Sequence, residues 1–279
     1  MVAHGDECGD HAARRAMKHW KRWVARAASE CAALHRGSSG PRPGFRVLLY
    51  HAVGSRVAHD TYGISVAPEL FERQMTALVD DSAFRLVGCQ EGLSSDADMR
   101  VAVTFDDGYR DTLLVAAPRL VSRAIPFSVF VVPTYVTSGD ATYLTPAELK
   151  VLSAMPGCSI GAHGMTHRRL TTLDDQALMG ELKDSRAWLE DTIAQQVTMV
   201  AYPHGAVDQR VRDAAAQAGY TVGCCSYPGM NDAHRDPLLL CRTEIVGADT
   251  MRVFSQKLEG AWDWTRWRST DPAVTERLN

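Results

Sequence analysis

Short apolar runs alternate with amphipathic stretches along the chain from Phe45 onward. Each run has the length of a β-strand and is bounded by turn-forming or charged residues, which favours strands over buried helices. The expected strands cover residues 45–50, 85–87, 101–105, 127–132, 158–162, 198–202, 221–224 and, more weakly, 244–246.

Helical patterns fall between these runs. Pro68 is typical of a first helical turn, and Thr145-Pro-Ala-Glu148 has the spacing of a capping box, in which two residues cap each other's backbone N–H groups. The expected helices cover residues 68–79, a segment after Thr145, 174–193, and 207–218, which Gly219 would end. Alternation of strands and helices predicts an α/β fold with parallel strands. Seven or eight strands in one domain favour a barrel, which is expected to be incomplete.

The first 44 residues differ from the rest. Apolar positions at steps of three and four predict an amphipathic helix over residues 12–34, with Trp20 and Trp23 beside a basic stripe. Such a helix can lie on an anionic membrane surface, or it can pack on the rest of the protein or on a partner. Its alanine-rich apolar face favours packing, because it would bind lipid weakly. Residues 37–44 are rich in Gly, Ser and Pro and are expected to form a linker to one domain over residues 45–279.

Composition and charge narrow the function classes. The net charge of −3 over 279 residues argues against a dedicated nucleic-acid-binding protein, which needs a concentrated basic surface. The seven cysteines lack Cys-x-x-Cys spacing, which favours reduced thiols over disulfides or a thiolate zinc site. We find no apolar run that is typical of a signal peptide or a membrane span. A cytoplasmic location is therefore expected, peripheral at the inner membrane face if the basic helix binds lipid.

Polar clusters follow three of the expected strands, at the ends where sites assemble in parallel α/β folds. The first contains Asp106 and Asp107. Two adjacent carboxylates repel each other unless a cation or a specific role compensates. Successive residues of a strand point to opposite sides, but Gly108 would let the backbone turn so that both face one cavity. One could bind a metal while the other transfers protons; the alternative is capping of a helix.

The second cluster contains His163 and His167, whose spacing places two imidazoles on one face of a helical turn and is common in metal sites. The third is Tyr202-Pro-His-Gly205, which is either a rigid turn presenting backbone N–H groups to a ligand or a plain turn. Two histidines and one aspartate suit Zn²⁺, which lowers the pKa of its water to about 7. The second carboxylate could accept a proton from that water. These residues predict a hydrolase in which metal-activated water attacks an amide carbonyl.

In this order the motifs resemble those of the polysaccharide deacetylase family, carbohydrate esterase family 4. They are Thr104-Phe-Asp-Asp-Gly108, His163-x-x-x-His167 and Ala201-Tyr-Pro-His-Gly205, and residues 48–53 resemble the first strand of one branch of the family. The likeness covers about residues 45–262. It implies a distorted (β/α)7 barrel that removes N- or O-acetyl groups from sugars. It also implies Asp106 as the base, Asp107, His163 and His167 as metal ligands, and the backbone N–H of His204 as the oxyanion donor.

The chain departs from the family pattern in several places. Gly164 stands where Ser or Thr is usual, so Thr166 is the candidate that braces the loop. Ala201 stands where an arginine usually orients the base. The Asp-then-Trp motif and the late Leu-x-x-His motif, which supplies the general acid, are not found, and the matching region reads Leu240-Cys-Arg242. The candidates for the acid are His204 and His51, each at the end of an expected strand.

We therefore expect a zinc-dependent deacetylase that acts on N-acetylhexosamine units of a saccharide or glycan precursor. Loops 54–63 and 135–143 are expected to set substrate choice. The expected site consists of Asp106 and His204 as catalytic residues, His51, Tyr202 and Pro203 as substrate-binding residues, and Asp107, His163 and His167 as metal ligands.

Two alternatives remain. One is a catalytically decayed protein that binds sugars or a partner, which the missing arginine and late histidine suggest. The other is a non-haem iron oxygenase, since these enzymes also use two histidines and one carboxylate. The adjacent second aspartate and the α/β alternation count against the oxygenase.

Overall fold

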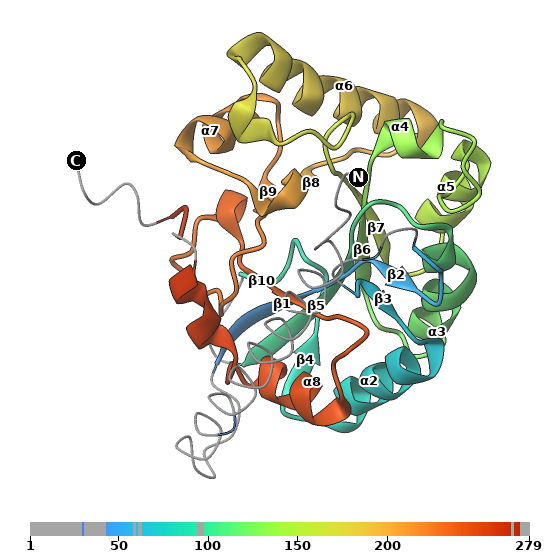
Figure 1. The fold of residues 1–279 in the computed structure, drawn as a ribbon, viewed down its shortest axis with the longest axis vertical. Coiled ribbons are helices and arrows are strands. Elements are labelled where there is room, and N and C mark those ends of the chain that lie inside the picture. Colours follow the sequence, from blue (N-terminus) through green and yellow to red (C-terminus); the bar gives the residue numbers. More distant parts are fainter. Residues whose placement is uncertain are drawn as a thin grey trace, which may run out of the picture.

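Seven parallel strands curl into a nearly closed barrel, with helices around the outside (Figure 1). The computed structural model describes residues 30, 43–57, 60, 63–93, 98–268 and 271–273, with the backbone alone at 266–268. The strands follow the order β10-β1-β5-β6-β7-β8-β9. The two ends of this path meet at a parallel bridge between Cys224 and Leu240, which nearly closes the barrel. The predicted α/β barrel is confirmed.

Most of the expected strands are present close to their predicted bounds. They are β1 Gly44–Tyr50, β4 Phe84–Leu86, β5 Met99–Phe105, β6 Phe127–Val131, β7 Cys158–Ala162, β8 Met199–Ala201, β9 Val222–Cys224 and β10 Arg242–Glu244. β4 pairs with the first part of β5, beside the main path. β10 begins two residues before the predicted strand 244–246 and overlaps it at Glu244, and the short pair β2 Ala52–Val53 and β3 Ser65–Val66 was not predicted.

The described helices include all four that the sequence predicts after residue 45. They are α2 Pro68–Asp80, α3 Ala117–Val121, α4 Pro133–Val136, α5 Pro146–Ser153, α6 Asp175–Ile193, α7 Gln209–Gln217 and α8 Met251–Leu258, and a π-helical turn, Thr112–Ala116, leads into α3. The capping box at the start of α5 is complete, because Thr145 and Glu148 each accept the other's backbone N–H. α3, α4 and α8 were not predicted. Thr250 caps α8 by accepting the N–H of Val253.

Two apolar layers follow from the alternation of side chains along the strands. In β1, Phe45 and Val47 belong to the small cluster inside the barrel, whereas Leu48 and Tyr50 belong to the large core between the sheet and the helices. The interior is crowded: a Cβ added at Gly161 would lie 2.5 Å from the ring of Phe130. The filled interior leaves the carboxyl ends of the strands as the place for a site.

The predicted helix over residues 12–34 and most of the linker lie outside the described residues. Glu30 is described, and its carboxylate forms an ion pair with Arg252 of α8. The division at residue 44 therefore stays a prediction.

Within the described ranges, none of the helices combines the length and the apolar character that crossing a membrane requires. The five cysteines in these ranges are free thiols, as predicted.

Candidate metal centre and active site

The two aspartates face the same cavity because the backbone turns between them. Asp106 continues the inward alternation of β5, and Asp107 itself adopts a left-handed backbone with φ of 72°. Gly108 follows with φ of 78°. The sequence assigned the turn to Gly108 alone, but it begins one residue earlier. A non-glycine residue in this conformation costs roughly 1–2 kcal/mol, so the surrounding structure must hold Asp107 in place.

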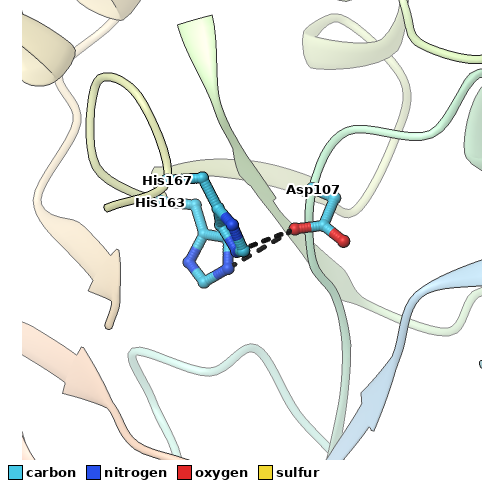
Figure 2. Close-up of side chains that lie close together, drawn as sticks. All are labelled: Asp107, His163 and His167. Atoms are coloured by element: carbon cyan, nitrogen blue, oxygen red, sulfur yellow. Dashed lines mark ion pairs between the residues drawn. The ribbon is translucent and has the colours of Figure 1, made fainter. Parts of the chain in front are cut away.

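Asp107, His163 and His167 form the candidate metal centre (Figure 2). Asp107 Oδ1 lies 3.6 Å from Nε2 of His163 and 3.4 Å from Nε2 of His167. One ligand atom from each residue falls within 4.8 Å of the others. Asp107 Oδ1 is buried without a hydrogen-bond donor. A carboxylate oxygen and two imidazole nitrogens that converge in this way fit a divalent metal of the zinc type.

The two histidines are held by different means. His163 Nδ1 lies 2.8 Å from the carbonyl oxygen of Ala201. Because a carbonyl only accepts, Nδ1 carries the proton and Nε2 can offer its lone pair to a metal. Burial is the main cause that lowers the pKa of His167 to about 4, so His167 is neutral near pH 7. The two rings therefore present nitrogen atoms of the kind that metal binding requires.

The expected helical turn between these histidines is wrong. Residues 163–167 form a loop, in which Gly164 has φ of 69° and His167 has φ of 60°. The convergence that the spacing suggested is present, but the loop produces it. Glu181 of α6 and Pro203 lie next to this loop, and Glu181 accepts a hydrogen bond from its backbone.

Arg242 binds Asp106 from the far end of the chain. Its Nη1 and Nη2 atoms donate to the two carboxylate oxygens at 2.7 Å each, and its Nε donates to the carbonyl oxygen of Cys225 at 3.0 Å. Its guanidinium carbon lies 5.6 Å from the centre of the Phe130 ring. The side chain of Asp106 is only 3% exposed. Burial opposes ionisation of Asp106, but the charge of Arg242, followed by that of His163, outweighs it and lowers the pKa to about 2.

Arg242 is the main site residue that sequence reasoning missed. It replaces, from β10, the arginine that is usual at the position of Ala201. One signal was available: Arg242 follows the apolar run 238–241, and a buried arginine needs an anionic partner. The sequence does not say which carboxylate that partner is.

The two candidate acids lie near different residues of the site, His51 near Asp106 and His204 near His167. His51 follows β1 and is half-buried, and its Nδ1 is buried without a hydrogen-bond partner. Its charge contributes to the lowered pKa of Asp106. His204 is exposed, in a left-handed backbone with φ of 60°, and its ring centre lies 4.5 Å from that of His167. Asp111 fixes the segment after His51 by accepting the N–H groups of Val53 and Ser55 at 2.8 and 2.9 Å.

The other two expected substrate residues are buried. Tyr202 is fully buried in the core outside the barrel, and its hydroxyl donates to the carbonyl oxygen of Leu238 at 2.9 Å. Because Ala201 faces the barrel interior, the next side chain faces the helices. Pro203 is also buried, and it packs near Gly164. The structure thus brings His51 and His204 to the candidate site but directs the side chain of Tyr202 away from it.

Three tyrosines extend the site along one side. The ring of Tyr135 lies 5.7 Å from His167 and 4.6 Å from Tyr143, and Tyr143 stacks on Tyr109 at 5.2 Å. Burial, followed by the charge of Asp107, raises the pKa of Tyr135 to about 12, so its hydroxyl stays protonated and can donate. Tyr135, in α4, and Tyr143 lie within residues 135–143, the segment that the sequence expected to be a loop that sets substrate choice.

Known proteins are similar to this chain in sequence and in fold. The family model described as polysaccharide deacetylase matches residues 94–223. YxkH of Bacillus subtilis (strain 168), whose name assigns it to the polysaccharide deacetylases, is 29% identical over 218 residues, which cover 76% of this chain and 75% of YxkH. The deacetylase PplD of Streptococcus pyogenes, solved in complex with acetate, is 26% identical with a TM-score of 0.69, covering 77% of this chain and 99% of that chain.

A more distant structure shows the fold alone. IcaB from Ammonifex degensii has a TM-score of 0.62 at 20% identity, and the match covers 80% of this chain and 98% of that chain. The barrel, the ordered motifs and these relatives lead to one assignment. The chain is similar to proteins of the polysaccharide deacetylase family, carbohydrate esterase family 4, which are hydrolases that cleave acetyl groups from sugars.

Proposed function

We propose that the protein is a metal-dependent N-deacetylase of saccharides that contain N-acetylhexosamine. The observation that carries this proposal is the convergence of Asp107, His163 and His167 beside a second carboxylate, Asp106, which Arg242 holds separately. The three ligands would hold a divalent metal, for which zinc is the best fit. When bound, this metal supplies a Lewis acid that polarises the acetyl carbonyl and acidifies water.

In this proposal Asp106 is the general base. Its low pKa keeps it ionised throughout the neutral range, and both its oxygens are fixed by Arg242. Asp106 Oδ2 also lies 3.7 Å from Nε2 of His163, so the carboxylate sits beside the metal cluster. From this position it can accept a proton from water that attacks the acetyl carbonyl. A base with so low a pKa is a weak proton acceptor, and it acts by orienting the water as well as by accepting its proton.

We assign the proton donor to His51. Its ring lies close enough to Asp106 for the two charges to interact, and its Nδ1 is buried without a hydrogen-bond partner within the protein. The sequence placed His204 in the catalytic pair and His51 with the substrate. The exposed ring of His204, near that of His167, is better suited to contact the sugar at the rim. The backbone N–H of His204 remains the proposed oxyanion donor.

The aromatic side chains support a sugar as the substrate. Tyr135 and Tyr143 place ring faces and protonated hydroxyls next to the metal cluster. Aromatic faces pack on the apolar faces of pyranose rings, and hydroxyl groups bond the ring substituents, which is the usual mixture in small-molecule sites. The oxygenase alternative has no such support, since the proteins that the chain resembles are named as deacetylases, which are hydrolases.

The test is acetate release from a panel of N-acetylated saccharides and saccharide precursors by zinc-loaded protein. We expect loss of one acetyl mass from at least one member of the panel and no release by Asp106→Asn. If the wild type and Asp106→Asn both bind zinc and neither releases acetate, the decayed sugar-binding alternative is correct.

A separate proposal concerns residues 12–34. Their basic pattern with two tryptophans supports contact with an anionic membrane face or a partner, which would place the enzyme beside a cytoplasmic glycan precursor. The test compares how the full chain and a variant lacking residues 1–40 partition to anionic vesicles. Equal partitioning would contradict the membrane contact.

A further inference from the structure

Glu181 is a buried carboxylate that reaches the loop between the two histidines. It lies on α6 and is 7% exposed. Oε2 accepts the backbone N–H of Met165 at 2.8 Å and that of Thr166 at 2.9 Å, while Oε1 accepts the hydroxyl of Thr166. Three donors from two consecutive loop residues therefore converge on one side chain of a neighbouring helix.

The loop needs such a partner because of its backbone. Gly164 and His167 both have positive φ, at 69° and 60°, so the loop that carries the two imidazoles contains two left-handed residues. That path turns the N–H groups of Met165 and Thr166 toward α6, where unpaired donors would be costly. The carboxylate of Glu181 accepts a hydrogen bond from each of these two N–H groups. Hydrogen bonds to a charged acceptor are stronger than those between neutral groups.

The carboxylate of Glu181 packs closely against the backbone of Gly164, where a larger residue would have little room. A Cβ at position 164 would lie 3.0 Å from Oε2 of Glu181 and 3.3 Å from Cγ of Pro203. The serine or threonine that is usual in the family at this position would therefore crowd the carboxylate, which would have to shift by a few tenths of an ångström. In this chain the loop hydroxyl comes from Thr166 instead, and it bonds to Glu181.

We propose that Glu181 is a positioning residue that sets the separation of His163 and His167 and thereby the metal affinity of the site. This inference rests on the proposed metal centre. Glu181 acts through the loop backbone and is not itself a ligand, since its two oxygens are occupied by loop donors. Groups that orient metal ligands commonly change metal affinity about 10–100-fold when they are removed.

The test is Glu181→Gln, which keeps the size of the side chain but replaces one acceptor oxygen with an amide donor. We expect zinc affinity, measured by competition with a chelating dye, to fall about 10–100-fold. The visible spectrum of the Co²⁺-substituted protein should also change, because the ligand geometry is altered. A smaller drop is expected for Thr166→Val, which removes only the hydroxyl contact and serves if Glu181→Gln does not fold.

The matched control is Glu190→Gln. Glu190 lies on the same helix, and its carboxylate also accepts a backbone N–H, that of Val197, at 3.0 Å. This variant loses the same kind of contact away from the histidine loop, and we expect wild-type zinc affinity and an unchanged Co²⁺ spectrum. Wild-type affinity and spectrum in folded Glu181→Gln would overturn the positioning role and leave the proposed function standing. Failure of the wild type to bind zinc would overturn both.

Discussion

Arg242 and Asp106 are 136 positions apart in the chain, yet two bonds of 2.7 Å join the guanidinium to both carboxylate oxygens. The pair is buried, and it sits beside the metal cluster. Asp106 is therefore oriented from one side by a fixed cation, while its neighbour Asp107 belongs to the metal cluster. The two adjacent carboxylates therefore have different environments, and the role of each can be tested by replacing the residues around it.

Replacing Arg242 should impair both stability and the base. Arg242→Gln leaves a buried carboxylate without its cation, at a cost of about 3–5 kcal/mol. The pKa of Asp106 is lowered in the folded protein from 3.8 to about 2. The pair thus stabilises the fold above about pH 4, and its contribution is lost as the pH falls toward 2. Denaturant unfolding at neutral and acid pH would measure this difference.

The same variant should change the pH profile of activity. Without the guanidinium, burial dominates and raises the pKa of Asp106. The protonated fraction of the base at a given acid pH then increases, so the acid limb of kcat/KM should move to higher pH. An unchanged acid limb in folded Arg242→Gln would show that another group sets it.

Asp106→Asn should separate metal binding from turnover. The variant keeps the side-chain shape but cannot accept a proton, so kcat is expected to fall about 10²–10⁴-fold while zinc binding is retained. Metal content and acetate release are measured on the same preparation. Joint loss of both would mean that Asp106, rather than Asp107 alone, ligates the metal.

His163→Ala should lose metal and activity together. Its Nε2 is one of three converging ligand atoms, and its Nδ1 bond to Ala201 fixes the ring. Chelator treatment of the wild type should likewise abolish acetate release, and zinc should restore it. His163→Ala, in contrast, should not recover when zinc is added at the level that restores the wild type.

Gly164→Ser should weaken the site although serine is usual there in the family. The added Cβ would meet the Glu181 carboxylate at 3.0 Å, and serine is disfavoured at φ of 69°. We expect lower zinc affinity than in the wild type and a stability loss of about 1 kcal/mol or more. Tighter zinc binding by Gly164→Ser would contradict the fit between Gly164 and Glu181.

Replacing Tyr202 should lower stability, whereas replacing Tyr135 should weaken substrate binding. Tyr202→Phe leaves the carbonyl of buried Leu238 without its donor, so stability should fall by about 1–3 kcal/mol with little change in KM. Tyr135→Ala removes a ring beside His167, so KM for the saccharide should rise several-fold. Thermal unfolding and steady-state kinetics on both variants decide between these roles. A raised KM in Tyr202→Phe would restore it as a substrate residue.

The sequence by itself determined most of the strands, four of the described helices and the edge of the sheet where the site would form. Apolar runs of strand length, the capping box at Thr145 and the stop at Gly219 act within a few residues, and each is found in the structure. Because the strands are parallel, their carboxyl ends meet at one edge. The motifs that follow β5, β7 and β8 therefore lie at the same edge of the sheet. The position of the metal cluster could be predicted from sequence patterns within each of these segments.

Only the tertiary structure decided which distant side chains complete the site. Arg242 reaches Asp106 because β10 pairs with β1 and β1 pairs with β5, a strand order that local patterns do not specify. Glu181 meets the histidine loop because of how α6 packs beside β7, and Tyr202 is turned outward by the register of β8. Contacts between segments far apart in sequence depend on packing and strand order, so no pattern within one segment can encode them.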